Sequence, residues 1–324
     1  DVIPAPIADA GVNLSECDVP FTITTATATA NTYSSLQWVS SSGGTFVGGI
    51  NNTINPTYIP SATDISAGTV DLTLTAFPIN PCSVASVSTI TVSIQASPEI
   101  TVTNQAPICE DAENITVTGT NIVNASNLLY TSTTGTIINN ETTLTPTVTP
   151  SATDITNGFI TLTVTANPLG NCASISEIIT IPVVKNPIVN AGVSKTFCEG
   201  ESITTSDATA ANIGAGNFQW TNNGGDGVFS TSANGLITTY IPGDTEINNG
   251  AVQLTLTSTA TSPCTTNATD TVVYTLLKKP VLTVSPTIVS ICEDENYQVP
   301  VNQVNITNFN PEFYETNFYE TLSF

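Results

Sequence analysis

Three acidic residues in a repeated motif are the first candidates for chemistry in this sequence. Asp64, Asp154 and Glu246 each begin the pattern acidic-Ile-x-x-Gly, and each pattern directly precedes a run of alternating apolar and polar residues. A carboxylate at this position can accept backbone N–H bonds at the start of a one-turn helix, with the glycine taking the left-handed exit. A carboxylate is also an oxygen ligand for calcium. We expect a helix cap, and calcium binding is the alternative.

The calcium alternative also uses acidic residues beside the first cysteine of each repeat. In an immunoglobulin-type sandwich these would lie at the same end as the Asp64 motif and would face the next repeat. Oxygen ligands from both turns would then meet at a domain junction. No D-x-D-x-D-G loop is present, and calcium at domain junctions is the one candidate cofactor. The candidate ligands are Glu16, Asp18, Asp64, Glu110, Asp111, Asp154 and Glu246.

Seven cysteines are the second set of reactive residues. Their repeating positions indicate disulfides and an oxidising, extracellular compartment. In one scheme each repeat closes its own disulfide. Those pairs would be Cys17–Cys82, Cys109–Cys172 and Cys198–Cys264, with Cys292 left for residues outside the sequence.

Geometry argues against that scheme. In an immunoglobulin sandwich the first turn and the last hairpin lie at opposite ends, roughly 25 Å apart along a strand of about eight residues. A disulfide tolerates only ~7 Å between Cα atoms. In repeats stacked head to tail, the first turn of one repeat faces the last hairpin of the next. We favour this second scheme, although both stay open. Its pairs would be Cys17–Cys172 and Cys109–Cys264, with Cys82 and Cys198 bonded to neighbouring repeats outside these three domains.

The composition excludes several classes of function. The sequence has no His and no Arg, which removes Ser–His–Asp and Cys–His nucleophile systems and any histidine metal site. The acidic residues recur with the repeat, as expected of a structural role, so we expect no catalytic residue and no enzyme. A net charge of −22 repels nucleic acid, which is not an expected partner. We expect a mature protein or an internal piece, because the sequence contains no Met and starts at Asp1, and neither a basic n-region nor an apolar h-region opens it.

The elements that position these residues are short strands. Val70, Leu72, Leu74 and Ala76 alternate with polar residues, and a period of two predicts a strand with one buried face. The stretch that contains them begins at residue 60 and returns at residues 150 and 242, a period of about 90 residues. The chain is therefore a tandem array of small domains.

A third strand in each repeat carries a large aromatic residue, and a glycine-rich segment follows it. We expect the aromatic residue to be buried in the sandwich core, with an exposed sugar-binding platform as the alternative. The glycine-rich segment predicts a hairpin in which the glycines supply positive φ. The three aromatic residues are Trp38, Tyr130 and Trp220.

Seven short strands for every 90 or so residues, with no helical periodicity, predict an all-β fold. The expected architecture is a linear array of immunoglobulin-like Greek-key β-sandwiches. The expected domains are repeat 1 at 1–97, repeat 2 at 98–186, repeat 3 at 187–279, and the start of a truncated or divergent fourth repeat at 280–324.

The ordered motifs D-A-G, C-E-G/D, W-x4-G-G-x-F, Y-x-P-S-x-x-D-I-x-x-G-x-V-x-L-T-L-T-A and P-C resemble a known family over about residues 1–300. This family is the SprB-like repeat regions of large Bacteroidetes cell-surface gliding-motility adhesins. Repeat 2 departs from the pattern, because Tyr130 replaces the Trp and the D-A-G opening is missing. The repeats also look like PKD-type immunoglobulin modules, which serve as stalks in many exported proteins.

The resemblance implies a structural and adhesive segment of a secreted filament that supports surface attachment and gliding motility. It also implies type IX secretion and attachment at the outer membrane of the cell. The implied partners are neighbouring repeats of the same long chain, the gliding and secretion machinery of the outer membrane, and surface polysaccharide. The alternative is a polysaccharide-binding module, or the stalk of an exported hydrolase. A binding module would carry exposed aromatic residues in line along one face.

Overall fold

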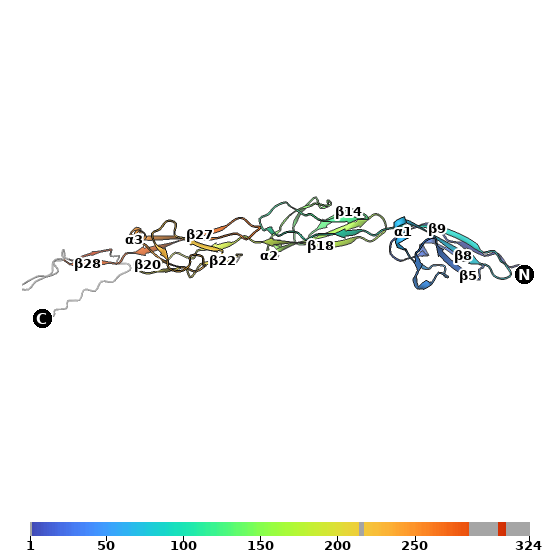
Figure 1. Ribbon diagram of the computed structural model, residues 1–324, viewed down its shortest axis with the longest axis horizontal. Coiled ribbons are helices and arrows are strands. Elements are labelled where there is room, and N and C mark those ends of the chain that lie inside the picture. Colours follow the sequence, from blue (N-terminus) through green and yellow to red (C-terminus); the bar gives the residue numbers. More distant parts are fainter. Residues whose placement is uncertain (1, 214–216, 285–303, 309–324) are drawn as a thin grey trace, which may run out of the picture. The chain divides into compact units, whose positions relative to one another are not determined.

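The computed structural model describes residues 2–213, 217–284 and 304–308. The chain divides into two compact units, residues 1–183 and 184–324. In the described residues the regular structure consists of strands, one short α-helix in each repeat, and two 3-10 helices in repeat 1, Ile23–Ala26 and Val47–Gly49. The fold is therefore all-β with tandem immunoglobulin-like sandwiches (Figure 1). Three separate hydrophobic clusters lie within residues 8–94, 100–183 and 189–276. The domain boundaries at 97, 186 and 279 stay predictions.

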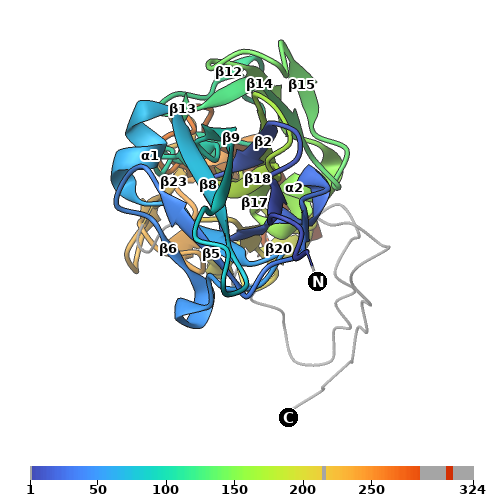
Figure 2. The ribbon, with the colours of Figure 1, turned by 90° about the vertical axis from the view of Figure 1, so that its right-hand side faces the viewer.

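Repeat 1 is built from a four-stranded sheet in the order β2-β9-β8-β5, a three-stranded sheet β3-β7-β6, and the pair β1-β4. In Figure 2 the helix α1 lies beside β8. The strands are β1 (Ile7–Asp9), β2 (Leu14–Cys17), β3 (Phe21–Thr22), β4 (Thr29–Asn31), β5 (Ser35–Ser40), β6 (Thr45–Phe46), β7 (Thr57–Ile59), β8 (Thr69–Phe77) and β9 (Ser86–Gln95), with α1 at Ala62–Ala67.

Repeat 2 has a four-stranded sheet β11-β18-β17-β14, a three-stranded sheet β12-β16-β15, and the pair β10-β13. Its elements are β10 (Glu99–Thr101), β11 (Ile108–Cys109), β12 (Ile115–Thr116), β13 (Asn121–Val123), β14 (Ala125–Thr131), β15 (Ile137–Asn139), β16 (Thr147–Thr149), α2 (Ala152–Asn157), β17 (Phe159–Pro168) and β18 (Ile175–Val184).

Repeat 3 lies in the second unit, with the sheets β20-β27-β26-β23, β21-β25-β24 and β19-β22. The pair β28 (Val281–Val284) and β29 (Val304–Thr307) follows it. The other elements are β19 (Ile188–Asn190), β20 (Thr196–Cys198), β21 (Ile203–Thr204), β22 (Thr209–Ala211), β23 (Phe218–Thr221), β24 (Val228–Phe229), β25 (Thr239–Ile241), α3 (Asp244–Asn249), β26 (Ala251–Ser258) and β27 (Ala268–Leu277).

The alternating strand behaves as its sequence predicts. On β8, Val70, Leu72, Leu74 and Ala76 are at most 2% exposed and belong to the core of repeat 1. The strand lies in the middle of its sheet and pairs with β9 on one side and β5 on the other. This burial explains why the apolar positions recur in all three repeats.

The number of strands differs from the seven expected, because each repeat has nine in its described residues. One extra strand comes from the opening segment, which changes partner partway along and so forms two strands. In repeat 1, β1 pairs antiparallel with β4, and β2 then pairs parallel with the last strand, β9. Strands of two to four residues are too short to show a period of two in the sequence.

The hairpin predicted after the aromatic strand is wrong in its strand pairing, although the glycine-rich segments of repeats 2 and 3 do contain glycines with positive φ, Gly135 at 83° and Gly224 at 89°. In repeat 1 the glycine-rich segment joins β5 to β6, and these strands lie in different sheets: β5 pairs with β8, whereas β6 pairs with β7. The segment therefore crosses from one sheet to the other. Gly43 and Gly44 do not have positive φ, so their role must come from something other than a left-handed turn.

Candidate functional site

The acidic motif of repeat 1 forms the helix cap. Ser61 is the N-cap of α1; its side chain accepts a hydrogen bond from the Asp64 N–H at 3.2 Å, and the Asp64 carboxylate accepts one from the Ser61 N–H at 2.8 Å. This reciprocal capping box satisfies two orphan donors of the helix. Gly68 ends the helix in the left-handed region at φ 73°, a conformation that glycine adopts without a steric penalty.

Asp64 does more than cap a surface helix, because it is fully buried. The Tyr58 hydroxyl donates to its carboxylate at 2.9 Å, and the Ser42 hydroxyl donates to the other carboxylate oxygen. A buried carboxylate is tolerated only where hydrogen bonds replace its hydration. We call this group of the acidic residue, the helix N-cap and the hydroxyl donors the carboxylate corner.

The carboxylate corner of repeat 2 uses different donors. Asp154, also fully buried, accepts hydrogen bonds from the Thr134 and Thr136 hydroxyls, the latter at 2.6 Å, and from the Ser151 N–H at 2.8 Å. Burial raises the pKa of Asp154, but the hydrogen bonds from Thr134, Thr136 and Ser151 outweigh burial and hold it below its usual value. Val148 occupies the position that Tyr58 has in repeat 1.

The carboxylate corner of repeat 3 has a tyrosine again but a different cap. The Tyr240 hydroxyl lies 2.8 Å and 3.0 Å from the two carboxylate oxygens of Glu246. The N-cap is Gly243, which has no side chain, and the Asp226 carboxylate accepts from the Thr245 N–H at 2.8 Å instead. Burial, reinforced by the Glu246 carboxylate, raises the pKa of Tyr240 to about 12, against the lowering effect of Asn222.

The glycine-rich segment is explained by the space at this corner. A Cβ on Gly44 would lie 2.0 Å from the Tyr58 hydroxyl and 2.6 Å from Asp64 Oδ2. A Cβ on Gly227 would lie 2.5 Å from the Tyr240 hydroxyl. In repeat 2 the same position is Thr136, whose hydroxyl takes the place of the missing tyrosine as the donor. Glycine is required for close approach, and only where a tyrosine is present.

The other candidate calcium ligands do not converge on a site. Asp18 accepts hydrogen bonds from Ser97, at 3.0 Å from its N–H and also from its hydroxyl. Glu110 and Asp111 lie in the turn that follows Cys109. Within the described ranges, no group of three acidic, Cys or His residues could hold a metal ion. The Asp64, Asp154 and Glu246 carboxylates are occupied as caps, and calcium at the domain junctions stays a prediction.

The cysteines form a joint between repeats 1 and 2. Cys17 is bonded to Cys172, with 5.4 Å between their Cα atoms, which is the second of the two pairing schemes. Cys109 and Cys264 are each disulfide-bonded as well, and their pairing with each other stays a prediction. Cys82 and Cys198 carry free thiols, and their bonds to neighbouring repeats stay a prediction too. Cys292 lies outside the described residues.

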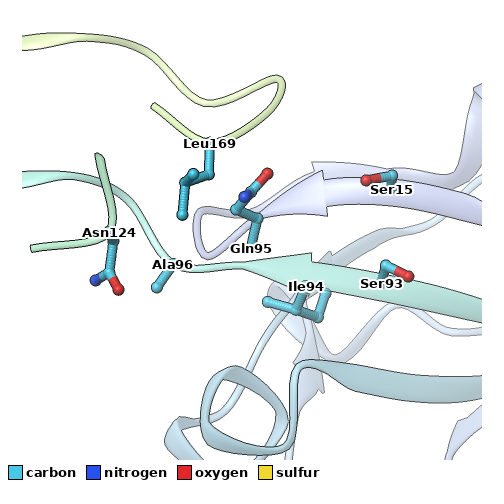
Figure 3. A pocket seen from close by; sticks show the side chains of 7 residues that line it. All are labelled: Ser15, Ser93, Ile94, Gln95, Ala96, Asn124 and Leu169. Carbon is cyan, nitrogen blue, oxygen red and sulfur yellow. The ribbon is translucent and has the colours of Figure 1, made fainter. Parts of the chain in front are cut away.

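Hydrogen bonds around the segment that links the two repeats reinforce this joint. The Gln95 carbonyl accepts from the Asp18 N–H at 3.0 Å and lies 3.6 Å from the Cys172 sulfur. The Asn124 amide donates to the Ser97 carbonyl at 3.2 Å. An open pocket at the joint is drawn in Figure 3. Its lining residues are Ser15, Ser93, Ile94, Gln95, Ala96, Asn124 and Leu169.

The three predicted aromatic residues lie in the cores, since Trp38, Tyr130 and Trp220 are at most 2% exposed. The indole N–H groups of Trp38 and Trp220 donate to the carbonyls of Thr53 and Leu236, at 3.2 Å and 3.1 Å. The Tyr130 hydroxyl donates to Thr120 at 2.7 Å. These rings are therefore not available as sugar-binding platforms.

The donors at the carboxylate corner were missed in the sequence. The signal that would have found them is a paired change between repeats: Gly44 occurs with Tyr58 and Gly227 with Tyr240, whereas Thr136 occurs with Val148. Reading the acidic motif alone predicts a cap, but it does not predict which distant residues donate to the same carboxylate.

No protein-family model matches the chain, and no curated protein matches it. Solved structures of tandem titin domains and tandem cadherin domains are similar to this chain at low sequence identity. Titin domains I67–I69, in an E-to-A variant, are 10% identical with a TM-score of 0.45, covering 86% of this chain and 100% of theirs. Cadherin domains 3–6 of protocadherin gamma B2 are 15% identical with a TM-score of 0.40, covering 88% and 76%.

Domains EC22–24 of mouse cadherin-23 are 14% identical with a TM-score of 0.38, covering 85% of this chain and 99% of theirs. Matches at these scores are too distant to support a functional argument. Among the described residues, no helix is long and apolar enough to cross a membrane.

Proposed function

We propose that this chain is a structural, non-enzymatic segment of a secreted cell-surface adhesin, in which tandem sandwiches space and support an adhesive region. The observation that carries the proposal is the Cys17–Cys172 bond, which ties two successive sandwiches together instead of closing one. A disulfide between repeats has little to contribute to a catalytic site, whereas it directly restrains the joint of a spacer. It also fits an extracellular location, because disulfides persist in oxidising compartments.

The buried carboxylate corners support the same proposal. Each reactive-looking carboxylate of the repeated motif is enclosed and hydrogen-bonded, so none is presented to a substrate. The net charge of −22 favours repulsion between neighbouring filaments and keeps a threonine-rich β surface soluble.

The finer part of the proposal rests on the resemblance to gliding-motility adhesins. We propose export by type IX secretion and attachment at the outer membrane as part of a filament that the gliding machinery moves. Neighbouring repeats of the same chain, that machinery and surface polysaccharide are the proposed partners. Calcium is the proposed cofactor only as an alternative, because its candidate ligands do not converge.

The experiment is to label this segment with a fluorescent antibody on living, unpermeabilised cells that produce it, and to film the label. Surface label that travels along the cell supports the motility adhesin. Surface label that stays in place supports a stationary adhesin and overturns the motility part. Label that appears only after permeabilisation overturns the proposed function.

A further inference from the structure

The position of the Cys17–Cys172 bond determines which part of unit 1 can carry tension. Cys17 ends β2, close to the start of the unit, and Cys172 lies between β17 and β18, close to its end. The two residues are 155 positions apart in the sequence. Residues 18–171 therefore form a closed covalent loop.

Only a small part of unit 1 lies outside this loop: β1 and β2 before Cys17, and β18 after Cys172. The loop contains the remaining strands of both sandwiches, with the buried aromatic residues Trp38 and Tyr130 and the buried carboxylates Asp64 and Asp154. A force applied on the two sides of unit 1 passes from Cys17 through the sulfur atoms to Cys172. It does not extend the backbone of the loop.

We propose that the Cys17–Cys172 bond makes unit 1 a redox-controlled tether, inextensible when oxidised and extensible when reduced. This inference rests on the proposed structural function and adds a mechanism to it. The chain between Cys17 and Cys172 spans a sequence separation of 155, which corresponds to roughly 510–560 Å of extended chain at 3.3–3.6 Å per residue. Oxidised unit 1 keeps this length hidden even when its sheets come apart.

The change of state is an ordinary thiol–disulfide exchange. The thiolate of a small dithiol attacks the sulfur of Cys17, which is half-buried, whereas Cys172 is buried. A bond forms between the dithiol and Cys17, and the Cys172 thiolate leaves and takes up a proton. The second thiolate of the dithiol then displaces Cys17, so that two electrons reduce the disulfide and the dithiol closes into its own cyclic disulfide.

The test is single-molecule force spectroscopy on the whole chain with handles at Val2 and Ile188, whose side chains are 96% and 60% exposed. Handles at these positions isolate the effect of the Cys17–Cys172 bond. A bond between Cys109 and Cys264 would not shorten the covalent path from one handle to the other. Three samples are compared: the oxidised protein, the same protein in dithiothreitol, and the variant Cys17→Ser/Cys172→Ser. The matched control is Cys82→Ser, which removes a free thiol.

We expect the reduced protein and the double variant to release roughly 510–560 Å more contour length than the oxidised protein and the Cys82→Ser control. Equal lengths in the oxidised and reduced samples would overturn the tether. Peptide mapping of the oxidised sample separates the two proposals. If the Cys17–Cys172 peptide is present and the lengths are equal, only the tether fails. If that peptide is absent, the covalent joint behind the proposed function fails as well. Should the double variant not fold, dithiothreitol on the native sequence still gives the comparison.

Discussion

All three repeats bury a carboxylate at the same corner, but repeat 2 supplies its hydrogen-bond donors differently from repeats 1 and 3. In repeats 1 and 3 a tyrosine hydroxyl donates to the buried carboxylate, and a glycine leaves room for the ring. In repeat 2 the tyrosine is replaced by Val148 and the glycine by Thr136, whose hydroxyl donates instead. The carboxylate and its helix stay constant, while the donor and the space it needs change together.

The difference teaches that the carboxylate is the fixed requirement of this fold. A buried carboxylate that loses one donor is costly, because the remaining charge is left without hydration. Replacing the tyrosine with valine is tolerable only when another residue supplies a hydroxyl to the carboxylate. A threonine at the position of Thr136 fits only when the tyrosine ring is absent. Either substitution alone should therefore destabilise the repeat, and only the two together convert the glycine–tyrosine pair into the threonine–valine pair.

The largest loss of stability is expected when repeat 1 receives the threonine of repeat 2 but keeps its own tyrosine. Gly44→Thr places a Cβ on the Tyr58 hydroxyl. It should destabilise repeat 1 by about 4 kcal/mol, because overpacking costs about 1–3 kcal/mol and the loss of the Tyr58–Asp64 hydrogen bond adds to it. Adding Tyr58→Val rebuilds the repeat 2 arrangement, so the double variant should recover about half of the loss. The measurement is a double-mutant cycle on the free energy of unfolding of repeat 1, read from hydrogen exchange of its peptides.

Gly43→Thr is the matched control for this cycle. A Cβ on Gly43 would meet Ser61 atoms no closer than 3.7 Å, and we expect a change within about 1 kcal/mol. Additive effects of Gly44→Thr and Tyr58→Val would show that the donor and the space are not coupled.

The second effect is the loss of the charged acceptor in repeat 2. Asp154→Asn cannot accept from Thr134, Thr136 and Ser151 together, and should destabilise repeat 2 by about 3 kcal/mol because buried donors lose their partner. Glu99→Gln, at an exposed position of the same repeat, should change stability by less than about 0.5 kcal/mol. Hydrogen exchange of repeat 2 peptides gives both values, and equal effects of the two substitutions would refute the role of Asp154.

The third effect is a pH dependence in repeat 2. The folded-state pKa of Asp154 is lowered, since hydrogen bonds from Thr134 and Thr136 outweigh its burial. A lowered pKa contributes stability above the unfolded value near 3.9, and this contribution is lost as the pH falls through the folded value. We expect repeat 2 to lose stability below about pH 4, and the Asp154→Asn variant to lack this component. An unchanged acid profile in the variant would contradict the assignment.

The smallest effect concerns the N-cap, which also has two solutions. Serine is usually a better N-cap than glycine. In repeat 3, however, Asp226 supplies the cap, and a Cβ on Gly243 would lie 2.4 Å from the carboxyl carbon of Asp226. Gly243→Ser should therefore destabilise repeat 3 by about 1 kcal/mol. Ser61→Gly in repeat 1 should cost only a few tenths, about 0.3 kcal/mol. Thermal unfolding of both variants measures the pair, and stabilisation by Gly243→Ser would refute the Asp226 cap.

Much of the fold could be predicted because its signals are local. The alternation on β8 predicts its buried face, the acidic motif predicts a cap, and the position of Trp38 predicts a core residue. The hairpin prediction failed because two glycines look the same whether they turn a chain or make space for a ring. Gly44 is explained only by Tyr58 and Asp64, which lie 14 and 20 positions away in the sequence.

The disulfide pairing shows the same limit. Sequence spacing allows Cys17 to pair with either Cys82 or Cys172, and strand length favours the second without deciding it. The structure resolves the choice because it places Cys17 and Cys172 with 5.4 Å between their Cα atoms. The pairing depends on how two successive repeats contact each other, and the sequence pattern within one repeat does not specify that contact.

The most direct test of the account is peptide mapping of the purified protein without reduction. The joint between repeats predicts a linked peptide pair that contains Cys17 and Cys172, which separates on reduction, and a thiol at Cys82 open to alkylation. Recovery of a Cys17–Cys82 pair would contradict the joint. It would leave each repeat as an independently closed sandwich, and the proposed tether would have no covalent basis.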